Sequence, residues 1–257
     1  MKRMTYLDYA AATPLDRRVL RAMLPYLKEE FGNPSSIHAA GVRSRQAIES
    51  ARASVAGVIG ARQEEVVFTS GATESINLAI QGLLARHPGH IVTLATEHQA
   101  ALSALHADVT YVDVDEFGVV KAEDVLRAIR PDTVLVTIML ANNEIGVINP
   151  VAAIGRELEK LRKQSGSAFP LLHTDATQAA NYLDLNVTRL HVDMMSLSGS
   201  KIYGPKGAGM LFVRRGVELA PLLVGGRQEN RLRAGTENVA GIVGFAEALR
   251  LAQETRG

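Results

Sequence analysis

Residues 169–178 read FPLLHTDATQ, an apolar run that ends in an acid and a polar turn. The run predicts a buried strand over residues 169–175, which places Asp175 at the carboxyl end of that strand. A carboxylate in such a position costs free energy unless it is paired. A cationic ring nitrogen of a bound ligand would pair it. The alternative is a helix N-cap, with Gln178 near the capping-box position.

Apolar strands and helical segments alternate in both directions from this run. Further strands are predicted over residues 64–70, 90–96, 109–114, 133–140, 192–198 and 208–215. Helices are predicted over residues 16–30, 37–60, 75–85, 122–130, 151–164 and 239–253. Strands that are apolar throughout and separated by helices favour a mostly parallel sheet that is covered on both faces. The expected fold class is therefore α/β, with three α/β/α layers and a mostly parallel sheet.

The composition fits a globular protein and argues against nucleic acid or a membrane as a partner. The 257 residues are 47% hydrophobic and 21% charged, with a net charge of +1 and no basic block. Neither a signal peptide nor an apolar run of the roughly 20 residues that span a bilayer is recognisable, so a cytoplasmic location is expected. The sequence contains no cysteine, and its seven histidines lack a spacing such as HExxH. No disulfide and no metal site is therefore predicted.

Residues 70–75, SGATES, lie between a predicted strand and a predicted helix. Free amides at the start of a helix, together with the helix dipole, can bind a phosphate there. Gly71 would let the backbone approach the phosphate, and the hydroxyl of Thr73 could add a hydrogen bond. The alternative is ordinary helix capping by Ser70 or Thr73.

Residues 196–201, SLSGSK, place Lys201 just beyond a strand and beside small hydroxyl residues. Desolvation and nearby cations lower the pKa of a lysine and suit it to imine formation. The alternative is a solvated surface lysine. We expect Lys206, which lies in the Gly/Pro turn that follows, to be structural.

Two more polar clusters follow predicted strands, at residues 96–98 (TEH) and 142–146 (NNEIG). His98 could act as an acid or base or stack on a flat ring, or it could be a rim histidine. The two asparagines could donate hydrogen bonds to a ligand oxygen, or they could simply form a turn. All five clusters are expected at the same edge of one sheet, which is where open α/β sheets bind their ligands.

Eight motifs occur in a fixed order along the chain: LDYAAATP, FGNPSSIH, VFTSGATESINLAI, TEHQA, NNEIGV, HTDATQA, MSLSGSKIYGPKGAG and RAGTENV. This set closely resembles the NifS/IscS-like cysteine desulfurases, which are pyridoxal 5'-phosphate (PLP) enzymes of fold type I in the class V aminotransferase family. The resemblance runs almost to residue 257. It implies a PLP-dependent transferase large domain over residues 1–257, with residues 1–15 as a candidate extended arm, and a homodimer that shares its sites.

The resemblance implies catalytic roles for individual residues. Lys201 would be the Schiff-base lysine, and Asp175 would pair with the pyridine nitrogen. His98 would stack over the ring and shuttle protons. Gln178 would hydrogen-bond the phenolate oxygen, and Asn143 would lie near the cofactor oxygen and the substrate carboxylate.

The same resemblance implies a set of phosphate-binding residues: Ala72, Thr73, Ser198 and Ser200 from one chain, and Thr236 from the neighbouring subunit. Arg233 would help order the loop that carries Thr236. Ser200 stands where many relatives have a phosphate-binding histidine, because this chain reads SGSK and they read SGHK. A hydroxyl can still donate a hydrogen bond, so phosphate binding is expected.

The implied function is that of a PLP-dependent cysteine desulfurase, which forms an aldimine with L-cysteine and mobilises sulfur for iron–sulfur clusters or thio-cofactors. Family members carry a C-terminal small domain with the cysteine that takes up sulfur and an arginine for the substrate carboxylate. We expect both to be absent here, so a sulfur-acceptor or complementing protein is a candidate partner. The alternatives are a PLP-dependent aminotransferase or lyase of another specificity, and a catalytically incomplete PLP-binding or dimerising module.

Overall fold

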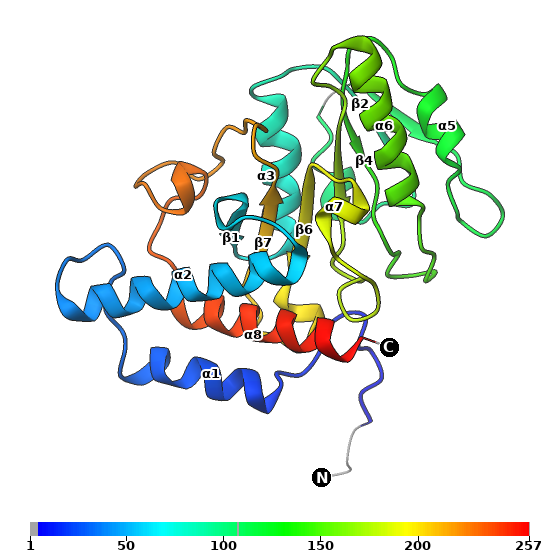
Figure 1. Ribbon diagram of the computed structural model, residues 1–257. Helices are drawn as coiled ribbons and strands as arrows, with labels where there is room; N and C mark the ends of the chain where they lie inside the picture. The colour runs from blue at the N-terminus through cyan, green and yellow to red at the C-terminus, as the bar shows by residue number, and fades with distance from the viewer. Residues whose placement is uncertain (1–4, 107, 257) are drawn as a thin grey trace.

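The computed structural model describes residues 5–106 and 108–256, which form one seven-stranded sheet with helices on both faces (Figure 1). The strand order across the sheet is β1-β7-β6-β5-β4-β2-β3. The strands are β1 (Val66–Thr69), β2 (His90–Leu94), β3 (Val109–Val112), β4 (Thr133–Thr137), β5 (Leu171–Asp175), β6 (Met194–Ser198) and β7 (Gly209–Val213). Each lies within a range predicted from the sequence.

Six of the seven strands point in the same direction. Strand β7 pairs antiparallel with both of its neighbours, β1 and β6, so those two strands are parallel to each other in direction. All remaining neighbours pair in parallel. The mostly parallel sheet predicted from the apolar strands is thus confirmed, and β7 is its one reversed member. The carboxyl ends of the other six strands meet at one edge of the sheet.

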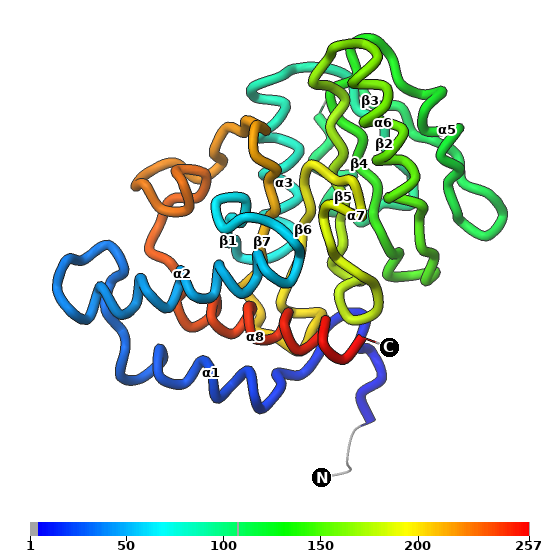
Figure 2. Tube along the Cα trace, viewed as in Figure 1, coloured from blue at the N-terminus to red at the C-terminus, as the bar shows by residue number. Residues whose placement is uncertain are grey.

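The helices form the outer layers. Those of four residues or more are α1 (Arg17–Lys28), α2 (Ala39–Ile59), α3 (Ala72–Leu84), α4 (Gln99–Leu102), α5 (Ala122–Arg127), α6 (Val151–Ser165), α7 (Val187–Leu190) and α8 (Val239–Thr255). Helix α8 packs against both α1 and α2, and Figures 1 and 2 show these three helices side by side although α8 lies at the other end of the chain. Helix α3 packs on β7 and β6. The three-layer α/β/α fold class is therefore confirmed.

Strand β1 (VVFT) is buried throughout because both faces of the sheet are covered. Val66 and Phe68 belong to one hydrophobic cluster, which also contains residues of α2 and α8, whereas Val67 belongs to a second cluster with residues of α3. Successive side chains of a strand point to opposite faces of the sheet. A strand with a helical layer on each face therefore buries every residue, as an apolar run without polar alternation predicts.

A close backbone approach and a strand ladder fix the strand ends at the carboxyl edge of the sheet. A Cβ atom on Gly209, at the start of β7, would lie 2.6 Å from the Cα of Gly71, so only glycine lets β7 approach the β1–α3 loop this closely. The β5–β6 ladder extends to the pair Asp175 and Ser196. The strand ends that carry the predicted site residues are thus held in register. Within the described part of the chain, no helix is long and apolar enough to cross a membrane.

Candidate active site

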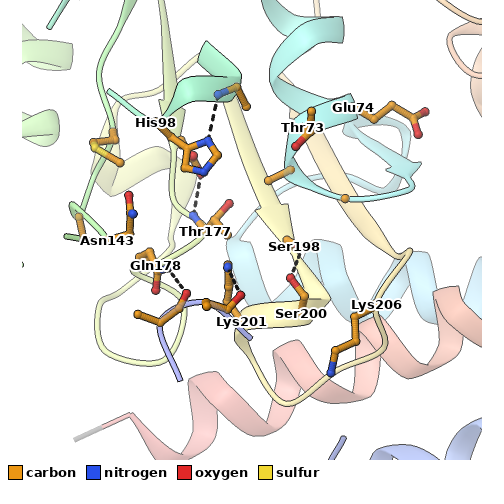
Figure 3. A pocket seen from close by; sticks show the side chains of 18 of the residues that line it. Thr73, Glu74, His98, Asn143, Thr177, Gln178, Ser198, Ser200, Lys201 and Lys206 are labelled. Carbon is orange, nitrogen blue, oxygen red and sulfur yellow. Dashed lines mark hydrogen bonds between the residues drawn. The ribbon is translucent and has the colours of Figure 1, made fainter. Parts of the chain in front are cut away.

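A cavity of about 700 Å³ opens at the carboxyl edge of the sheet. It collects side chains from all five polar clusters that the sequence singled out. The predicted site residues that line it are Ala72, Thr73, His98, Asn143, Asp175, Gln178, Ser198, Ser200 and Lys201 (Figure 3). These residues come from the ends of β1, β2, β4, β5 and β6, as expected for strands that share one direction.

One end of the cavity contains the start of α3, where backbone amides could bind an anion. The N-cap residue of this helix is Gly71, with φ 146°, and it has no side chain to accept from the first amides. Among the described residues, the hydroxyl of Ser70 accepts none of these amides either, and its backbone amide donates to Oε2 of Glu74 at 2.8 Å. The amides of the first turn therefore stay available to a ligand, and the helix dipole favours a negative charge there. The hydroxyls of Ser198 and Ser200, 3.0 Å apart, lie on the same cavity.

Asp175 provides a buried acid on the same cavity. Its side chain is only 6% exposed, and its Oδ1 accepts the backbone amide of Thr177 at 2.9 Å. Residues 177–182 form turns and no helix, so the alternative of a helix N-cap is not observed. Burial raises the pKa of Asp175, while the Thr177 hydrogen bonds and then the fields of His98 and Lys201 act in the opposite direction. Among the residues that the structure describes, Asp175 forms no ion pair, so a cationic ligand group would find an unclaimed carboxylate there.

Lys201 ends a short 3-10 turn, Gly199–Lys201, that follows β6 directly. Its Nζ donates to the backbone carbonyl of Ala11, and Nε2 of Gln178 donates to the carbonyl of Ala10 at 2.9 Å. The amide of Thr13 donates to the carbonyl of Ser200 at 3.0 Å. A segment near the N-terminus therefore crosses the cavity beside Lys201 and is held by three separate contacts.

Lys206 lies on the same cavity, and its contact agrees with the structural role that the sequence favoured. Its Nζ donates to the backbone carbonyl of Thr13 at 2.7 Å, so it also anchors the N-terminal segment. Sequence reasoning did not place Ala10 or Ala11 at the site either. The one signal for them was the motif LDYAAATP, because their contacts are made by backbone carbonyls and carry no residue-specific pattern.

His98 lies at the N-cap of α4 and is exposed on the cavity. Its Nδ1 accepts the backbone amide of Ala100 at 3.0 Å, which leaves Nε2 as the nitrogen that carries the proton in the neutral ring. Figure 3 shows the ring between α4 and the turn that carries Thr177. The ring is therefore placed to exchange a proton through Nε2 with a ligand in the cavity.

The two neighbouring asparagines have different environments. Asn142 is buried and forms the turn that the sequence offered as an alternative: its Oδ1 accepts the amides of Glu144 and Ile145 at 2.8 and 3.0 Å. Its Nδ2 donates to the carbonyl of Thr96 at 2.9 Å. Asn143 is the one that lines the cavity and stays available to a ligand.

Thr236 does not line the large cavity of its own chain. It lies on a smaller pocket of about 220 Å³, together with Ser70, Gly207 and Arg233. Nε of Arg233 contacts Oε1 of Glu74 at 2.9 Å, so the loop that carries Thr236 is tied to the first turn of α3. The role of Thr236 at the phosphate of a neighbouring subunit stays a prediction.

These features define the class of protein: a three-layer α/β/α protein whose cavity joins an anion site, a lysine and a buried acid. This donor set fits PLP, which carries a phosphate, an aldehyde that reacts with amines and a ring nitrogen that pairs with a carboxylate. A model of the family described as "Aminotransferase class-V" matches residues 5–256. The chain therefore belongs to the class-V aminotransferase family, whose members are PLP-dependent enzymes.

Similar proteins include "Cysteine desulfurase IscS" from Dictyoglomus turgidum, which is 49% identical over 98% of this chain and 64% of the relative. "Putative cysteine desulfurase IscS 1" from Bacillus subtilis is 48% identical over 98% of this chain and 67% of the relative. The chain thus spans about two thirds of the length of these curated relatives. A solved structure titled "NIFS-LIKE PROTEIN" is 40% identical and superposes with a TM-score of 0.93 over 98% of this chain and 70% of that one. Another, "SspA in complex with cysteine", is 41% identical with a TM-score of 0.88 over 96% and 72%.

Proposed function

We propose that this chain is the cofactor-binding part of a PLP-dependent cysteine desulfurase that mobilises sulfur from L-cysteine. The observation that carries the proposal is the single cavity in which Lys201 and the buried Asp175 lie together with the free first turn of α3. The relatives named cysteine desulfurase and the similar structure titled as a complex with cysteine support L-cysteine as the substrate.

When bound, PLP would supply an electron sink that weakens bonds in an attached amino acid. The first turn of α3, with the hydroxyls of Ser198 and Ser200, would bind its phosphate. Lys201 would hold it covalently, and Asp175 would keep its ring nitrogen protonated through a charge-assisted hydrogen bond. These residues come from three different strand ends, so the sheet fixes the distances between them.

The remaining residues of the cavity would act on the substrate and on the outer edge of the ring. The imidazole ring of His98 would stack over the PLP ring, and its Nε2 would move protons at the substrate carbon. Asn143 and Gln178 would donate to the cofactor oxygen, and Asn143 would also reach the substrate carboxylate. Because Gln178 already holds the carbonyl of Ala10, the same amide would link the N-terminal segment to the ring.

The reaction moves one sulfur atom from L-cysteine to a thiol and leaves L-alanine and a persulfide, so it requires no external oxidant or reductant. The 257 residues contain no cysteine. The acceptor thiol would therefore come from outside these residues, on a partner protein or on a small thiol. We also propose a homodimer, in which Thr236 completes the phosphate site of the neighbouring subunit, and a role in iron–sulfur or thio-cofactor supply.

The proposal is tested by adding PLP to the purified protein and recording the visible spectrum before and after borohydride. Peptide mass spectrometry should then locate the reduced adduct on Lys201. L-cysteine with dithiothreitol as the acceptor thiol should give alanine and sulfide in equal amounts. A protein that stays colourless with added PLP would refute the proposal. Bound PLP without alanine formation would refute the desulfurase reaction and leave an aminotransferase or lyase of another specificity.

A further inference from the structure

Glu97 is a buried acid that the proposed reaction does not use. Its side chain is 6% exposed, and its Oε1 accepts the backbone amide of Met139 at 2.7 Å. Its Oε2 is buried and has no hydrogen-bond partner among the residues that the structure describes. A buried polar atom without a partner is an exception in folded proteins and calls for an explanation.

Glu97 and Met139 lie beyond the carboxyl ends of two neighbouring strands, β2 and β4. The β2–β4 ladder ends at the pair Val92 and Val136. Past that point, the Glu97–Met139 bond and the bond from Nδ2 of Asn142 to the carbonyl of Thr96 hold the two chain segments together. Side-chain hydrogen bonds therefore connect the two segments beyond the last backbone pair of the β2–β4 ladder.

Each of the joined segments carries a residue of the cavity. His98 follows Glu97 directly, and Asn143 follows Asn142 directly. Met139 itself also lines the cavity. The contact between Glu97 and Met139 thus lies behind two side chains that face the predicted cofactor from different strands, and a shift of this contact would move one relative to the other.

Burial favours the neutral form of this acid. Burial raises the pKa of Glu97 to about 8. The hydrogen bond from Met139 lowers this pKa, and the negative charge of Asp175 raises it further. The charged group whose field acts on Glu97 is Asp175, at the end of β5. A neutral carboxyl group can still accept the amide of Met139 through its carbonyl oxygen without adding a second negative charge beside Asp175.

We propose that Glu97 is a positioning residue of the cofactor site, which joins the segments beyond the ends of β2 and β4 and so sets His98 and Asn143 relative to the ring. This inference rests on the proposed binding of PLP. Its central claim is that the accepting oxygen of Glu97 matters, rather than the volume of the side chain or its charge.

Two substitutions separate these properties. Glu97→Gln keeps an accepting oxygen and the shape without the ability to ionise, whereas Glu97→Met keeps the length and leaves the amide of Met139 unpaired. Thr93→Val is the matched control, because Oγ1 of Thr93 donates to the carbonyl of Thr137 at 2.9 Å and so joins the same two strands away from the cavity. Folding of each variant is checked by far-ultraviolet circular dichroism.

The first measurement is the dissociation constant of PLP, with the visible circular dichroism of the bound ring as a report on its surroundings. We expect Glu97→Met to weaken PLP binding about tenfold and to change the ring signal. Glu97→Gln and Thr93→Val should stay within about twofold of the unaltered protein. Equal binding by the Met and Gln variants would overturn the proposal, and so would an equal loss in Thr93→Val.

The second measurement needs no PLP, so it separates this inference from the proposed function. In the PLP-free protein, hydrogen exchange of the peptide over residues 138–145 should be faster in Glu97→Met than in Glu97→Gln. Exchange at the same rate in both variants would overturn the positioning role even if PLP binds. If the two variants differ in exchange as expected but the unaltered protein binds no PLP, the result would contradict the proposed function instead.

Discussion

Nζ of Lys201 and the backbone carbonyl of Ala11, 190 residues apart in sequence, are joined by a hydrogen bond across the large cavity. Lys206 makes a matching contact to the carbonyl of Thr13. Two lysines of one loop thus hold one N-terminal segment, yet only Lys201 follows directly on the end of β6. The position of each lysine relative to Asp175, rather than its charge, should decide which one reacts with PLP.

The first prediction compares these two lysines. Lys201→Ala should remove the borohydride-fixed PLP adduct, because Lys206 lies five residues further along the loop and does not follow directly on the end of β6, beside Asp175. Lys206→Ala should retain the adduct on Lys201. Mass spectrometry of the reduced proteins distinguishes the two variants. An adduct on Lys206 in the Lys201→Ala protein would show that either amine can reach the ring, and that the assignment of Lys201 is wrong.

The sequence predicted most of the sheet but could not predict the direction of β7. An apolar run indicates burial on both faces, and β7 is as fully buried as β1 and β6, which run in the opposite direction. Its reversal follows from its pairing with β1 and β6, whose first residues, Val66 and Met194, are 128 residues apart along the chain. Pairing over such a distance leaves no local pattern in the sequence. The polar clusters were predictable because each follows a strand end.

Other parts of the site had no signal that residue patterns could supply. The contacts of Ala10 and Ala11 are made by backbone carbonyls. His173 could act as an acid or base by residue type, but it is fully buried in the sheet. Its Nδ1 lies 2.8 Å from the hydroxyl of Thr137, and its Nε2 lies 2.9 Å from the hydroxyl of Ser196. His173 therefore belongs to the interior of the sheet and not to the cavity. Whether a polar side chain faces the cavity or the interior is decided by packing, which the sequence does not display.

The second prediction concerns the stability of the protein as a function of pH. The pKa of Glu97 is about 8 in the folded protein and ordinarily 4.5. Between these values the folded state keeps a proton that the unfolded chain releases, so the contribution of Glu97 to stability is present below 4.5 and is lost as the pH rises towards 8. The slope for one proton is about 1.4 kcal/mol per pH unit.

Urea denaturation of the unaltered protein and of Glu97→Gln at pH 5, 6, 7 and 8 measures this loss. The difference in unfolding free energy between the two proteins should shift in favour of Glu97→Gln by about 1.4 kcal/mol for each unit of rising pH. Other titrating groups are common to both proteins and cancel in the difference. A difference that does not change with pH would mean that Glu97 is ionised in the folded protein.

The third prediction concerns a buried ion pair that holds the loop before α8. Arg52 donates to both carboxylate oxygens of Glu229 at 2.8 Å, and Glu229 also accepts the amide of Phe68. The side chains of Arg52 and Glu229 are 9% and 2% exposed. Three consecutive residues of this loop, from Glu229 to Arg231, have φ angles of 44°, 54° and 68°. This left-handed backbone conformation is strained for residues other than glycine.

Arg52→Met should lower the free energy of unfolding by about 3–5 kcal/mol, because it leaves the Glu229 carboxylate buried and unpaired. The control is Arg43→Met, which removes an exposed pair with Glu30 and should cost at most about 1 kcal/mol. Thermal and urea denaturation measure both. Equal losses in the two variants would show that the buried pair contributes no more than a surface pair.

The fourth prediction compares two glycines. Gly71, with φ 146°, precedes the free first turn of α3, where an alanine would be strained by about 1–3 kcal/mol. Gly57 lies within α2 on its exposed side, and an added Cβ there meets nothing within 4 Å. Alanine at this position should therefore stabilise the helix by up to about 1 kcal/mol. Gly71→Ala should therefore lower stability and weaken PLP binding, while Gly57→Ala should raise stability and leave binding unchanged. Urea denaturation measures the stability of each variant, and isothermal titration with PLP and with inorganic phosphate measures the binding. Weaker binding of inorganic phosphate by Gly71→Ala would identify the start of α3 as the anion site. Unchanged affinity for both ligands in a folded Gly71→Ala protein would place the phosphate elsewhere in the cavity.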